Sequence, residues 1–177
     1  MIHLVYYVAA SEDGFIAGPN GELDWLHAFE SPDEDYGYSA FIEGIDALVM
    51  GRATFDVARS FPGPWPYGDR PVWVMSRQGV ASALPATVRV TAEAPRSLAA
   101  LWQSIGLRRV WLAGGGQVAS AFAAAGLIDE VLLATIPVAL GSGIPLFAAG
   151  SDGLAGMQLV ASVTLARGVV QRRYVQR

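Results

Sequence analysis

Short apolar runs alternate with helix-like segments along most of the chain, and this alternation restricts the fold more than any other feature of the sequence. The expected strands are HLVYYVAA (3–10), DALVMG (46–51), RPVWVMS (70–76), TVRV (87–90), RRVWLA (108–113) and DEVLLATIP (129–137). Helical spacing lies between them over 96–106 and 117–126, and also begins at about Ala53. Strands separated by helices are joined by right-handed crossovers, so the pattern predicts a largely parallel sheet covered on both faces.

The C-terminal segment departs from this alternation. MQLVASVTL (157–165) and VVQRRYVQR (169–177) flank a turn around Arg167 and Gly168, a pattern that predicts an antiparallel hairpin. A chain of 177 residues is long enough for one domain with a sizeable core and short for two. We therefore expect a single three-layer α/β domain over residues 1–177, with a mixed, mostly parallel sheet.

The segment SPDEDYGYSAFIEG (31–44) is expected to be a helix, because each end carries a typical signal. Ser31 suits the N-cap and Pro32 the first helical position. Glu34 would close a capping box with Ser31, and Gly44 follows the last turn. Carboxylates in a first turn stabilise a helix through capping and through its dipole, so the acidic residues of this turn need no further function.

Asp35 also permits a functional interpretation. In such a helix it shares a face with Tyr38 and Ile42, three and seven residues further on, and this stripe should face inward. A carboxylate that points into a pocket there would bind an N–H pair of a heterocycle and help to protonate it.

Composition and charge exclude several classes of protein and partner. The sequence is 53% hydrophobic and 16% charged, as in compact globular proteins. The net charge is −4, and all twelve basic residues are arginines without a basic run, so nucleic acid is not an expected partner. Cysteine is absent, which excludes disulfides and thiolate metal sites and fits the cytoplasm. The H-x-E and P-C-x-x-C motifs are also absent, so a zinc deaminase is excluded and no metal is expected.

Neither a leader nor a membrane span is expected. The N-terminus lacks a basic start followed by an apolar segment and a small-residue cleavage site. Residues 110–128 and 131–151 are uncharged and approach a membrane span in length, but glycine and proline interrupt them. We interpret each as a strand followed by another element of a buried core. The two histidines, His3 and His27, are expected to be structural or exposed.

Three of the expected strands end in unusual residues. These are Gly51-Arg52-Ala53-Thr54, Ser76-Arg77 and Gly114-Gly115-Gly116-Gln117. Parallel strands bring their carboxyl ends to one edge, where ligands bind in open α/β sheets, so the three segments should meet there. Glycines at a strand-to-helix turn let backbone N–H groups approach a phosphate, although they equally permit a tight turn without a ligand. The spacing differs from G-x-G-x-x-G, so the Rossmann fingerprint is absent.

The arginines at these strand ends favour a ligand-binding site over a tight turn without a ligand. Guanidinium groups bind phosphate through paired hydrogen bonds, so Arg52 and Arg77 favour a dinucleotide site over two solvated loop residues. Thr54 could cap the following helix and donate to a pyrophosphate oxygen. Ser76 and Arg77 suit a 2′-phosphate, which favours NADP over NAD.

Two loops are open to more than one interpretation. The glycine-rich segment FIAGPNGELDWL (15–26) follows the first strand and contains Trp25. It would either close over a bound ring or simply cap the sheet. FPGPWPYGDR (61–70) is expected to be a stiff connector, although its aromatic residues could line a pocket or a subunit contact.

Together these segments resemble the dihydrofolate reductase-like superfamily, in the branch related to the C-terminal reductase domain of the riboflavin-biosynthesis deaminase-reductase. The matching pieces, in family order, are YYVAASEDGFIAG, DALVMGRATF, VWVMSR, VWLAGGGQVASAF and IDEVLLATIPVALGSGIPLF. VMGRATF and the triple glycine together are the specific part of the match. The resemblance implies a dihydrofolate reductase-like fold with a sheet of about eight strands, NADPH as cofactor and a homodimer.

The resemblance also implies roles for individual residues. The cofactor residues it implies are Gly51, Arg52 and Thr54 at the phosphates, Ser76 and Arg77 at the adenosine 2′-phosphate, Gly114, Gly115, Gly116 and Gln117 around the pyrophosphate, and Ala10 and Ile16 beside the nicotinamide. Asp35 falls where dihydrofolate reductases hold the carboxylate that binds the pteridine, and Trp25 is expected beside the substrate.

We therefore expect an NADPH-dependent reductase that transfers a hydride to a C=N or C=O of a small heterocyclic or carbonyl substrate, with pterin- or pyrimidine-like rings favoured. No arginine matches the one that would bind the glutamate tail of folate, because Arg59 and Arg70 flank a loop that differs. The deaminase domain of the riboflavin enzyme has no counterpart in this sequence. The alternatives are a non-catalytic NADP(H)-binding or sensor protein of the same fold, and a dimeric structural domain without a ligand.

Overall fold

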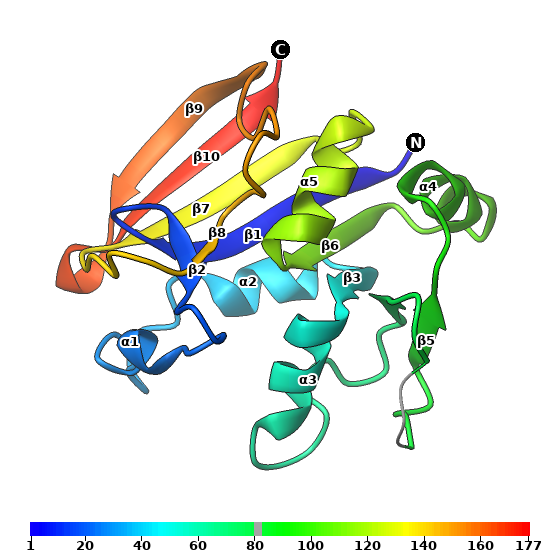
Figure 1. Cartoon of the computed structure of the whole chain (residues 1–177), viewed down its shortest axis with the longest axis horizontal. Coiled ribbons are helices and arrows are strands. Elements are labelled where there is room, and N and C mark those ends of the chain that lie inside the picture. The colour runs from blue at the N-terminus through cyan, green and yellow to red at the C-terminus, as the bar shows by residue number, and fades with distance from the viewer. Residues whose placement is uncertain (80–82) are drawn as a thin grey trace.

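An eight-stranded sheet forms the centre of the molecule in the computed structural model, which describes residues 1–79 and 83–177 (Figure 1). The strand order is β5-β4-β3-β6-β1-β7-β10-β9. The strands are β1 (His3–Ser11), β3 (Ala47–Gly51), β4 (Val72–Met75), β5 (Val88–Thr91), β6 (Arg109–Gly114), β7 (Glu130–Ile136), β9 (Met157–Thr164) and β10 (Val170–Gln176). β10 runs antiparallel to β7 and β9, and the other pairings are parallel. The expected mixed sheet and C-terminal hairpin are confirmed.

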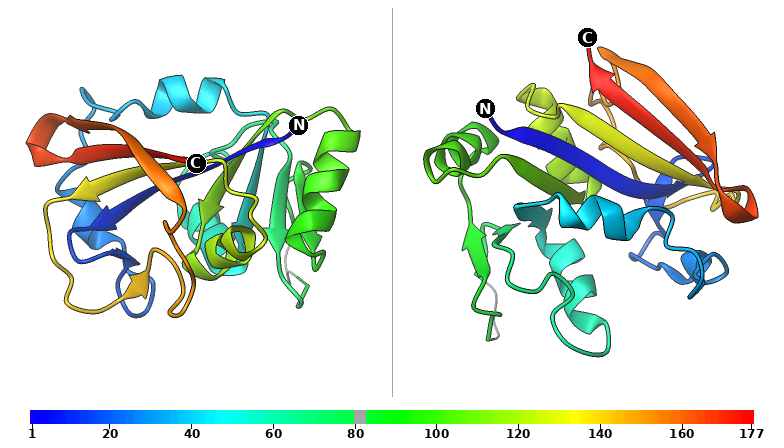
Figure 2. Two further views of the ribbon diagram at one scale, coloured as in Figure 1. Left: turned by 90° about the horizontal axis from the view of Figure 1, so that it is seen from above. Right: turned by 180° about the vertical axis from the view of Figure 1, so that it is seen from behind.

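Helices cover both faces of the sheet, and α2 and α5 lie on opposite sides of it (Figure 2). The main helices are α2 (Tyr38–Glu43), α3 (Arg52–Ser60), α4 (Pro95–Ser104) and α5 (Gly116–Ala124). Alternate residues of β3 face different cores, as the two-residue period of a strand requires. Leu48 packs with Phe41 of α2 and Phe55 of α3, whereas Val49 packs with Trp102 of α4 and Phe122 of α5. Within the described ranges, no helix is both long and apolar enough to cross a membrane.

The helix expected over 31–44 is much shorter than its sequence signals indicated. α2 begins only at Tyr38, after Gly37, which has a left-handed backbone with φ of 83°. Ser31 instead forms an isolated β-bridge with Glu34, so the predictions of an N-cap at Ser31 and of a capping box were wrong. Serine and acidic side chains also hydrogen-bond nearby backbone N–H groups in turns, and here that local alternative replaces the first helical turns.

A small second sheet, which the sequence did not predict, lies next to the start of α5. It pairs β2 (Phe15–Ala17) with β8 (Ile144–Pro145) in antiparallel orientation. A Cβ on Gly116 would collide with the carbonyl oxygen of Pro145, and one on Gly143 would collide with that of Ala17. These close contacts hold β2 and β8 against the turn between β6 and α5. Two short elements complete the chain, α1 (Asp24–His27) and the 3-10 turn η1 (Ala166–Gly168).

Candidate functional site

The three unusual strand ends lie side by side at one edge of the sheet. β3 lies between β4 and β6, and the register pairs Gly51 with Met75 and Met50 with Gly114. The turns that follow these strands therefore emerge next to one another, although they are far apart in the sequence. The juxtaposition expected from parallel topology is present.

The three consecutive glycines differ in backbone conformation and in the space around them. Gly114 has φ of 112°, which L side chains rarely adopt, and it is joined to Gly115 by a cis peptide bond. Gly116 packs directly on the Pro145 carbonyl, so a side chain has no room there. Gly115 has φ of −80°, and its added Cβ would make only ordinary contacts, 3.7 Å to Thr54 Oγ1 and 3.9 Å to Ile16 Cδ1. Neither the φ angle of Gly115 nor protein packing excludes a small side chain there, so a Cβ-sized volume beside Thr54 and Ile16 stays open.

Two helix N-termini flank this turn. α3 follows Gly51 and α5 follows Gly115, and neither has a side-chain hydrogen bond that caps its first turn. The unpaired N–H groups of such ends carry partial positive charge and suit an anionic group. The end of β3 approaches α5 closely because Gly51 has no side chain, since a Cβ there would lie 3.1 Å from Val118 Cγ2 of α5. Thr54 Oγ1 lies near the positions that side chains at 114 and 115 would occupy. The strand ends thus form one cradle of backbone donors.

The polar side chains around this cradle differ in how far they are already engaged. Arg52 pairs with Asp56 at 2.7 Å and donates to the carbonyl oxygen of Gly79 at 3.1 Å, so it connects α3 to the loop after β4. The Ser76 hydroxyl hydrogen-bonds the backbone of Gln78, both as donor and as acceptor. Arg77 is exposed and forms no hydrogen bond or ion pair with the described residues. Of these three side chains, Arg77 can therefore reorient most easily toward a ligand.

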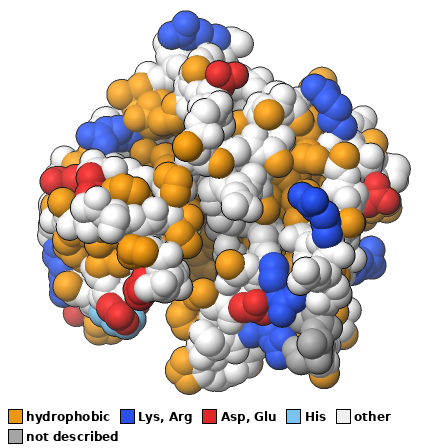
Figure 3. Space-filling model, viewed as in Figure 1, with side chains coloured by type: hydrophobic (Ala, Val, Ile, Leu, Met, Phe, Trp, Pro, Cys, Tyr) orange, Lys and Arg blue, Asp and Glu red, His pale blue; other side chains and the backbone are white. Residues whose placement is uncertain are grey.

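Strands β1 and β6 separate near their carboxyl ends, and the gap between their backbones is called the crevice below. The β1–β6 ladder ends at the pair Tyr6–Leu112, whereas β1 stays paired with β7 as far as Ser11. Ala10 lies in the part of β1 that is released from β6, and its side chain is only 2% exposed, so it can offer a ligand its backbone alone. Ile16, on β2, lies beside Gly115. The same face of the molecule is hollowed between the region of β2 and α1 and helix α3, and hydrophobic side chains form the floor of the hollow (Figure 3).

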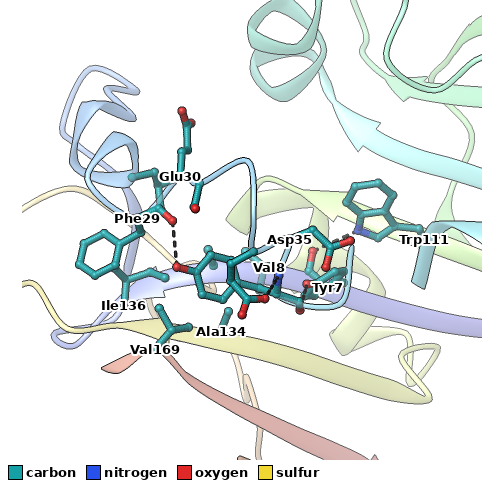
Figure 4. A pocket seen from close by; sticks show the side chains of 14 residues that line it. Tyr7, Val8, Phe29, Glu30, Asp35, Trp111, Ala134, Ile136 and Val169 are labelled. Atoms are coloured by element: carbon teal, nitrogen blue, oxygen red, sulfur yellow. Dashed lines mark hydrogen bonds between the residues drawn. The ribbon is translucent and has the colours of Figure 1, made fainter. Parts of the chain in front are cut away.

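A cavity of about 390 Å³ lies on the α2 side of the sheet. Strands β1, β6 and β7 form its floor through Tyr7, Val8, Ala9, Trp111, Ala134 and Ile136. The segment from α1 to α2 covers it and brings three carboxylates, those of Glu30, Glu34 and Asp35. In Figure 4, Asp35 and Tyr7 lie next to each other on the side nearer Trp111, and Phe29 and Ile136 lie on the other side. The volume suits a small ring system in a largely apolar setting with few polar groups.

Asp35 lines the cavity, but by a different route from the one expected. It precedes α2 instead of lying on its inward face, and its two oxygens accept the backbone N–H groups of Gly37 and Ser39, each at 2.9 Å. Hydrogen bonds from the Ser39 side chain and then from these N–H groups lower the pKa of Asp35 below its ordinary 3.8. The carboxylate is ionised at neutral pH and keeps free lone pairs, because each oxygen accepts only one backbone N–H.

Sequence reasoning missed the two aromatic side chains beside Asp35. Burial, and then the negative charge of Asp35, raise the pKa of Tyr7 above its usual 10.0, so the phenol stays protonated, and it donates to the carbonyl oxygen of Tyr36 at 3.4 Å. The indole N–H of Trp111 donates to the carbonyl oxygen of Tyr7 at 3.1 Å. A signal was present, because Tyr7 and Ala9 alternate along a strand whose other face is buried, but strand periodicity alone does not show that a face lines a cavity.

Trp25, which was predicted beside the substrate, is not among the residues that line this cavity. Trp25 packs with Phe29, Tyr36 and neighbouring apolar residues in a cluster at the end of β7, and its buried indole N–H has no hydrogen-bond partner. Gln117 is exposed at the start of α5, beside a second cavity of about 340 Å³ against β8. In the part of the chain that the structure describes, no three His, Asp or Glu side chains gather as a metal site would require.

Comparisons with known proteins connect this geometry to a family. The model of the RibD C-terminal domain matches residues 64–171. The uncharacterized protein YwjB of Bacillus subtilis is 36% identical over 143 residues, which are 81% of each chain. A putative riboflavin biosynthesis protein from Shewanella sp. PV-4 has a crystal structure that superposes with a TM-score of 0.88 at 32% identity, over 100% of this chain and 99% of that one.

A more distant structure shows the same fold. Dihydrofolate reductase from Enterococcus faecalis, solved with NADP(H), superposes with a TM-score of 0.67 at 20% identity, over 99% of this chain and 96% of that one. The fold is therefore dihydrofolate reductase-like, as the sequence predicted. The family match covers more than half of the chain, and the relatives extend over nearly all of it. The chain belongs to the RibD C-terminal domain family.

Proposed function

We propose that the protein is an NADPH-dependent reductase that acts on a small heterocyclic or carbonyl substrate, with a pterin- or pyrimidine-like ring favoured. One observation carries the proposal. The cradle at Gly114–Gly116 follows the end of β6, and the cavity that contains Asp35 is lined by Trp111 of the same strand, so a pyrophosphate on the cradle and a ring in the cavity would occupy neighbouring parts of the sheet. Reductases of this fold need these two sites next to each other, because the reacting carbon must meet the cofactor ring.

The residues present fit NADPH. Gly115 leaves open the volume that a Cβ would fill, and the uncapped starts of α3 and α5 suit the pyrophosphate. Arg52 and Thr54 would hold the phosphates from α3, while Ser76 and Arg77 would bind the adenosine 2′-phosphate. In the crevice, the backbone of Ala10 and the side chain of Ile16 would border the nicotinamide. Gly51 and Gln117 complete the cradle at the starts of the two helices.

The substrate would occupy the cavity, with Asp35 as its anchor. An ionised carboxylate accepts N–H groups of a heterocycle and so fixes which face of the ring is presented. When bound, NADPH supplies a hydride to the carbon of the C=N or C=O, and the adjacent nitrogen or oxygen then needs a proton. Asp35 would hold a water molecule against that atom, so that the water donates a proton and takes up another from bulk solvent while the carboxylate stays ionised. The protonated Tyr7 phenol would donate to the same ring by exchanging its long hydrogen bond to the Tyr36 carbonyl oxygen.

A non-catalytic NADP(H)-binding or sensor protein is the second candidate. It is favoured by the use of both Asp35 oxygens as caps of α2, because a carboxylate that already accepts two backbone N–H groups is less available to a substrate. NADPH oxidation that depends on an added substrate would exclude this candidate.

The proposal includes a homodimer in the cytoplasm. β9 is an edge strand, and its apolar side chains Leu159, Val160 and Val163 are 47%, 45% and 53% exposed. An exposed apolar edge invites pairing with another strand, and a second copy of β9 would cover it. The lack of cysteine suits a reducing compartment.

Two measurements test the proposal. Calorimetric titration with NADPH and with NADH shows whether a dinucleotide binds and whether the 2′-phosphate contributes. Absorbance of NADPH is then followed with panels of dihydropterins, pyrimidines and dicarbonyl compounds. Binding without oxidation in any panel would favour the sensor, and binding of neither nucleotide would refute both candidates.

A further inference from the structure

The cavity has an acidic lining, and this charge restricts the ligands that it can bind. Its lining contains the carboxylates of Glu30, Glu34 and Asp35, together with aromatic and aliphatic side chains, but no arginine or histidine. Glu34 accepts the backbone N–H of Tyr36 at 2.7 Å, and Asp35 accepts those of Gly37 and Ser39. These bonds hold two of the three carboxylates at the cavity and give neither of them a cationic partner.

The arginines nearest the cavity are engaged elsewhere. The chain contains no lysine and neither of its two histidines lines the cavity, so arginine is the side chain that could neutralise the three carboxylates or an incoming anion. Arg167 donates to the carbonyl oxygens of Ala28 and Glu30 from outside the loop. Arg70 donates to carbonyl oxygens at the far end of α2. Arg172 donates to Thr135 Oγ1. Thr135 lies between Ala134 and Ile136, which line the cavity, so its side chain points to the opposite face of the sheet.

An anion that entered this cavity would lose part of its hydration, would meet no cationic side chain among the described lining residues, and would be repelled by the exposed carboxylates of Glu30 and Asp35 and the half-buried one of Glu34. A neutral or cationic ring with N–H groups would instead gain hydrogen bonds to the same oxygens. Complementary charge chiefly sets selectivity between ligands of equal shape. We infer that the cavity rejects substrates bearing a phosphate or carboxylate tail and takes an uncharged or cationic N–H-bearing heterocycle. This inference rests on the proposed function and restricts its substrate class.

Pairs of ligands with one ring and different charge test the inference. One pair is 7,8-dihydrobiopterin with 7,8-dihydrofolate, and the other is 5-amino-6-(ribosylamino)uracil with its 5′-phosphate. Calorimetry on the NADPH-saturated protein gives the dissociation constant for each ligand. For at least one pair, we expect the dissociation constant of the uncharged member to be at least about tenfold lower than that of its anionic partner. The ratio of the two dissociation constants should become smaller at high salt.

A variant without the glutamate charges shows whether the selectivity comes from charge repulsion or from the shape of the cavity. The double substitution Glu30→Gln and Glu34→Gln keeps side-chain size and the acceptor for Tyr36, and it should reduce the selectivity severalfold. NADPH affinity and melting temperature should stay unchanged. Glu43→Gln removes one exposed charge from α2 outside the cavity and should leave the ratio as it is. Arg167→Gln shows whether Arg167 swings inward to bind an anion, and it should not weaken binding of the anionic members.

The inference is overturned by equal or tighter binding of the anionic members, by a ratio that the double variant does not change, or by binding of no member of either pair. The proposed function fails in a different way, through loss of NADPH binding or through absence of hydride transfer to ligands that do bind. The two sets of results are therefore distinguishable.

Discussion

The indole N–H of Trp111 donates to the carbonyl oxygen of Tyr7 at 3.1 Å, one residue beyond the last pair of the β1–β6 ladder. A side chain of β6 thus replaces the backbone donor that would have continued the ladder. The bond satisfies a carbonyl group that would otherwise face the opening crevice, where an unpaired buried acceptor is costly. It also fixes the indole of Trp111, which lines the cavity.

Alanine substitutions at positions 115 and 116 should have different effects, one on cofactor binding and the other on fold stability. Gly115→Ala should leave melting temperature nearly unchanged, because the new Cβ makes only ordinary contacts, but it should weaken NADPH binding at least about tenfold by obstructing backbone access. Gly116→Ala should destabilise the fold by about 1–3 kcal/mol through its collision with Pro145. Thermal unfolding and calorimetry check both variants. Unchanged NADPH affinity in Gly115→Ala would remove the cradle from the proposal.

Arg77→Ala should discriminate between the two nicotinamide cofactors. Loss of a charge-assisted contact to the 2′-phosphate should weaken NADPH binding by about 1–3 kcal/mol and leave NADH binding almost unaffected. The matched control is Arg108→Ala, an exposed arginine that precedes β6 at the other end of the sheet. Equal loss for both cofactors, or no loss for either, would contradict the role assigned to Arg77.

Asp35→Asn should slow substrate turnover by about 10² or more while NADPH affinity stays the same, since the amide keeps an acceptor for the cap of α2 but loses the charge. Because hydrogen bonds lower the pKa of Asp35 below 3.8, its carboxylate stays ionised as pH falls toward 4. Turnover should therefore show no acid limb from this group above about pH 4. Steady-state kinetics across pH test both points. Asp33→Asn, at an exposed neighbour outside the cavity, serves as the control, and wild-type turnover in Asp35→Asn would exclude the residue.

The free energy of unfolding should depend on pH through the ionisation of Glu130. Its carboxylate is 4% exposed and pairs with His3 and Arg173. Burial acts to raise its pKa, but hydrogen bonds and charges from these partners outweigh burial and lower the pKa below 4.5. The stability that Glu130 contributes is complete above about pH 4.5 and is lost as pH falls through the lowered pKa.

Glu130→Gln is therefore expected to cost about 1–3 kcal/mol in the free energy of unfolding at neutral pH, with a difference from wild type that shrinks below about pH 4.5. Denaturant unfolding at several pH values measures it, with Glu43→Gln as an exposed control. A difference that does not change with pH would refute this account.

Val163→Lys should disrupt the homodimer. A charged side chain on an edge strand opposes strand pairing, so sedimentation equilibrium should give a dimer for the wild type and a monomer for the variant. Leu101→Lys, at an apolar residue of α4 that is 41% exposed, should remain dimeric. A monomeric wild type would refute the dimer itself.

The sequence predicted the central strands well because β3 and most of β4, β6 and β7 are buried on both faces, and because α4 and α5 are each followed by a glycine. Parallel topology then placed Gly51, Ser76 and Gly114 at one edge without any knowledge of side-chain positions. The cavity was harder to predict. Ser31 and Glu34 carry ordinary helix-start signals, yet they form a bridge in a turn, because local hydrogen bonds compete with the first helical turn.

The placement of Trp25 shows a second limit. Its position in a glycine-rich loop suggested contact with a ring, but the indole packs in a cluster with Phe29 and Tyr36. Burial of a large aromatic side chain is favourable wherever a loop can reach an apolar surface. Loop composition does not specify which surface that is.

The separation of β1 from β6 also affects how such a protein can diverge. Beyond Tyr6, the central strand faces the crevice with its main chain, and main-chain N–H and C=O groups are the same whatever side chain each position carries. Substitutions along the crevice can therefore accumulate while the backbone groups that border a ligand persist. A binding surface inherited in this way can outlast recognisable sequence similarity, so new substrates can be acquired by changing the cavity alone.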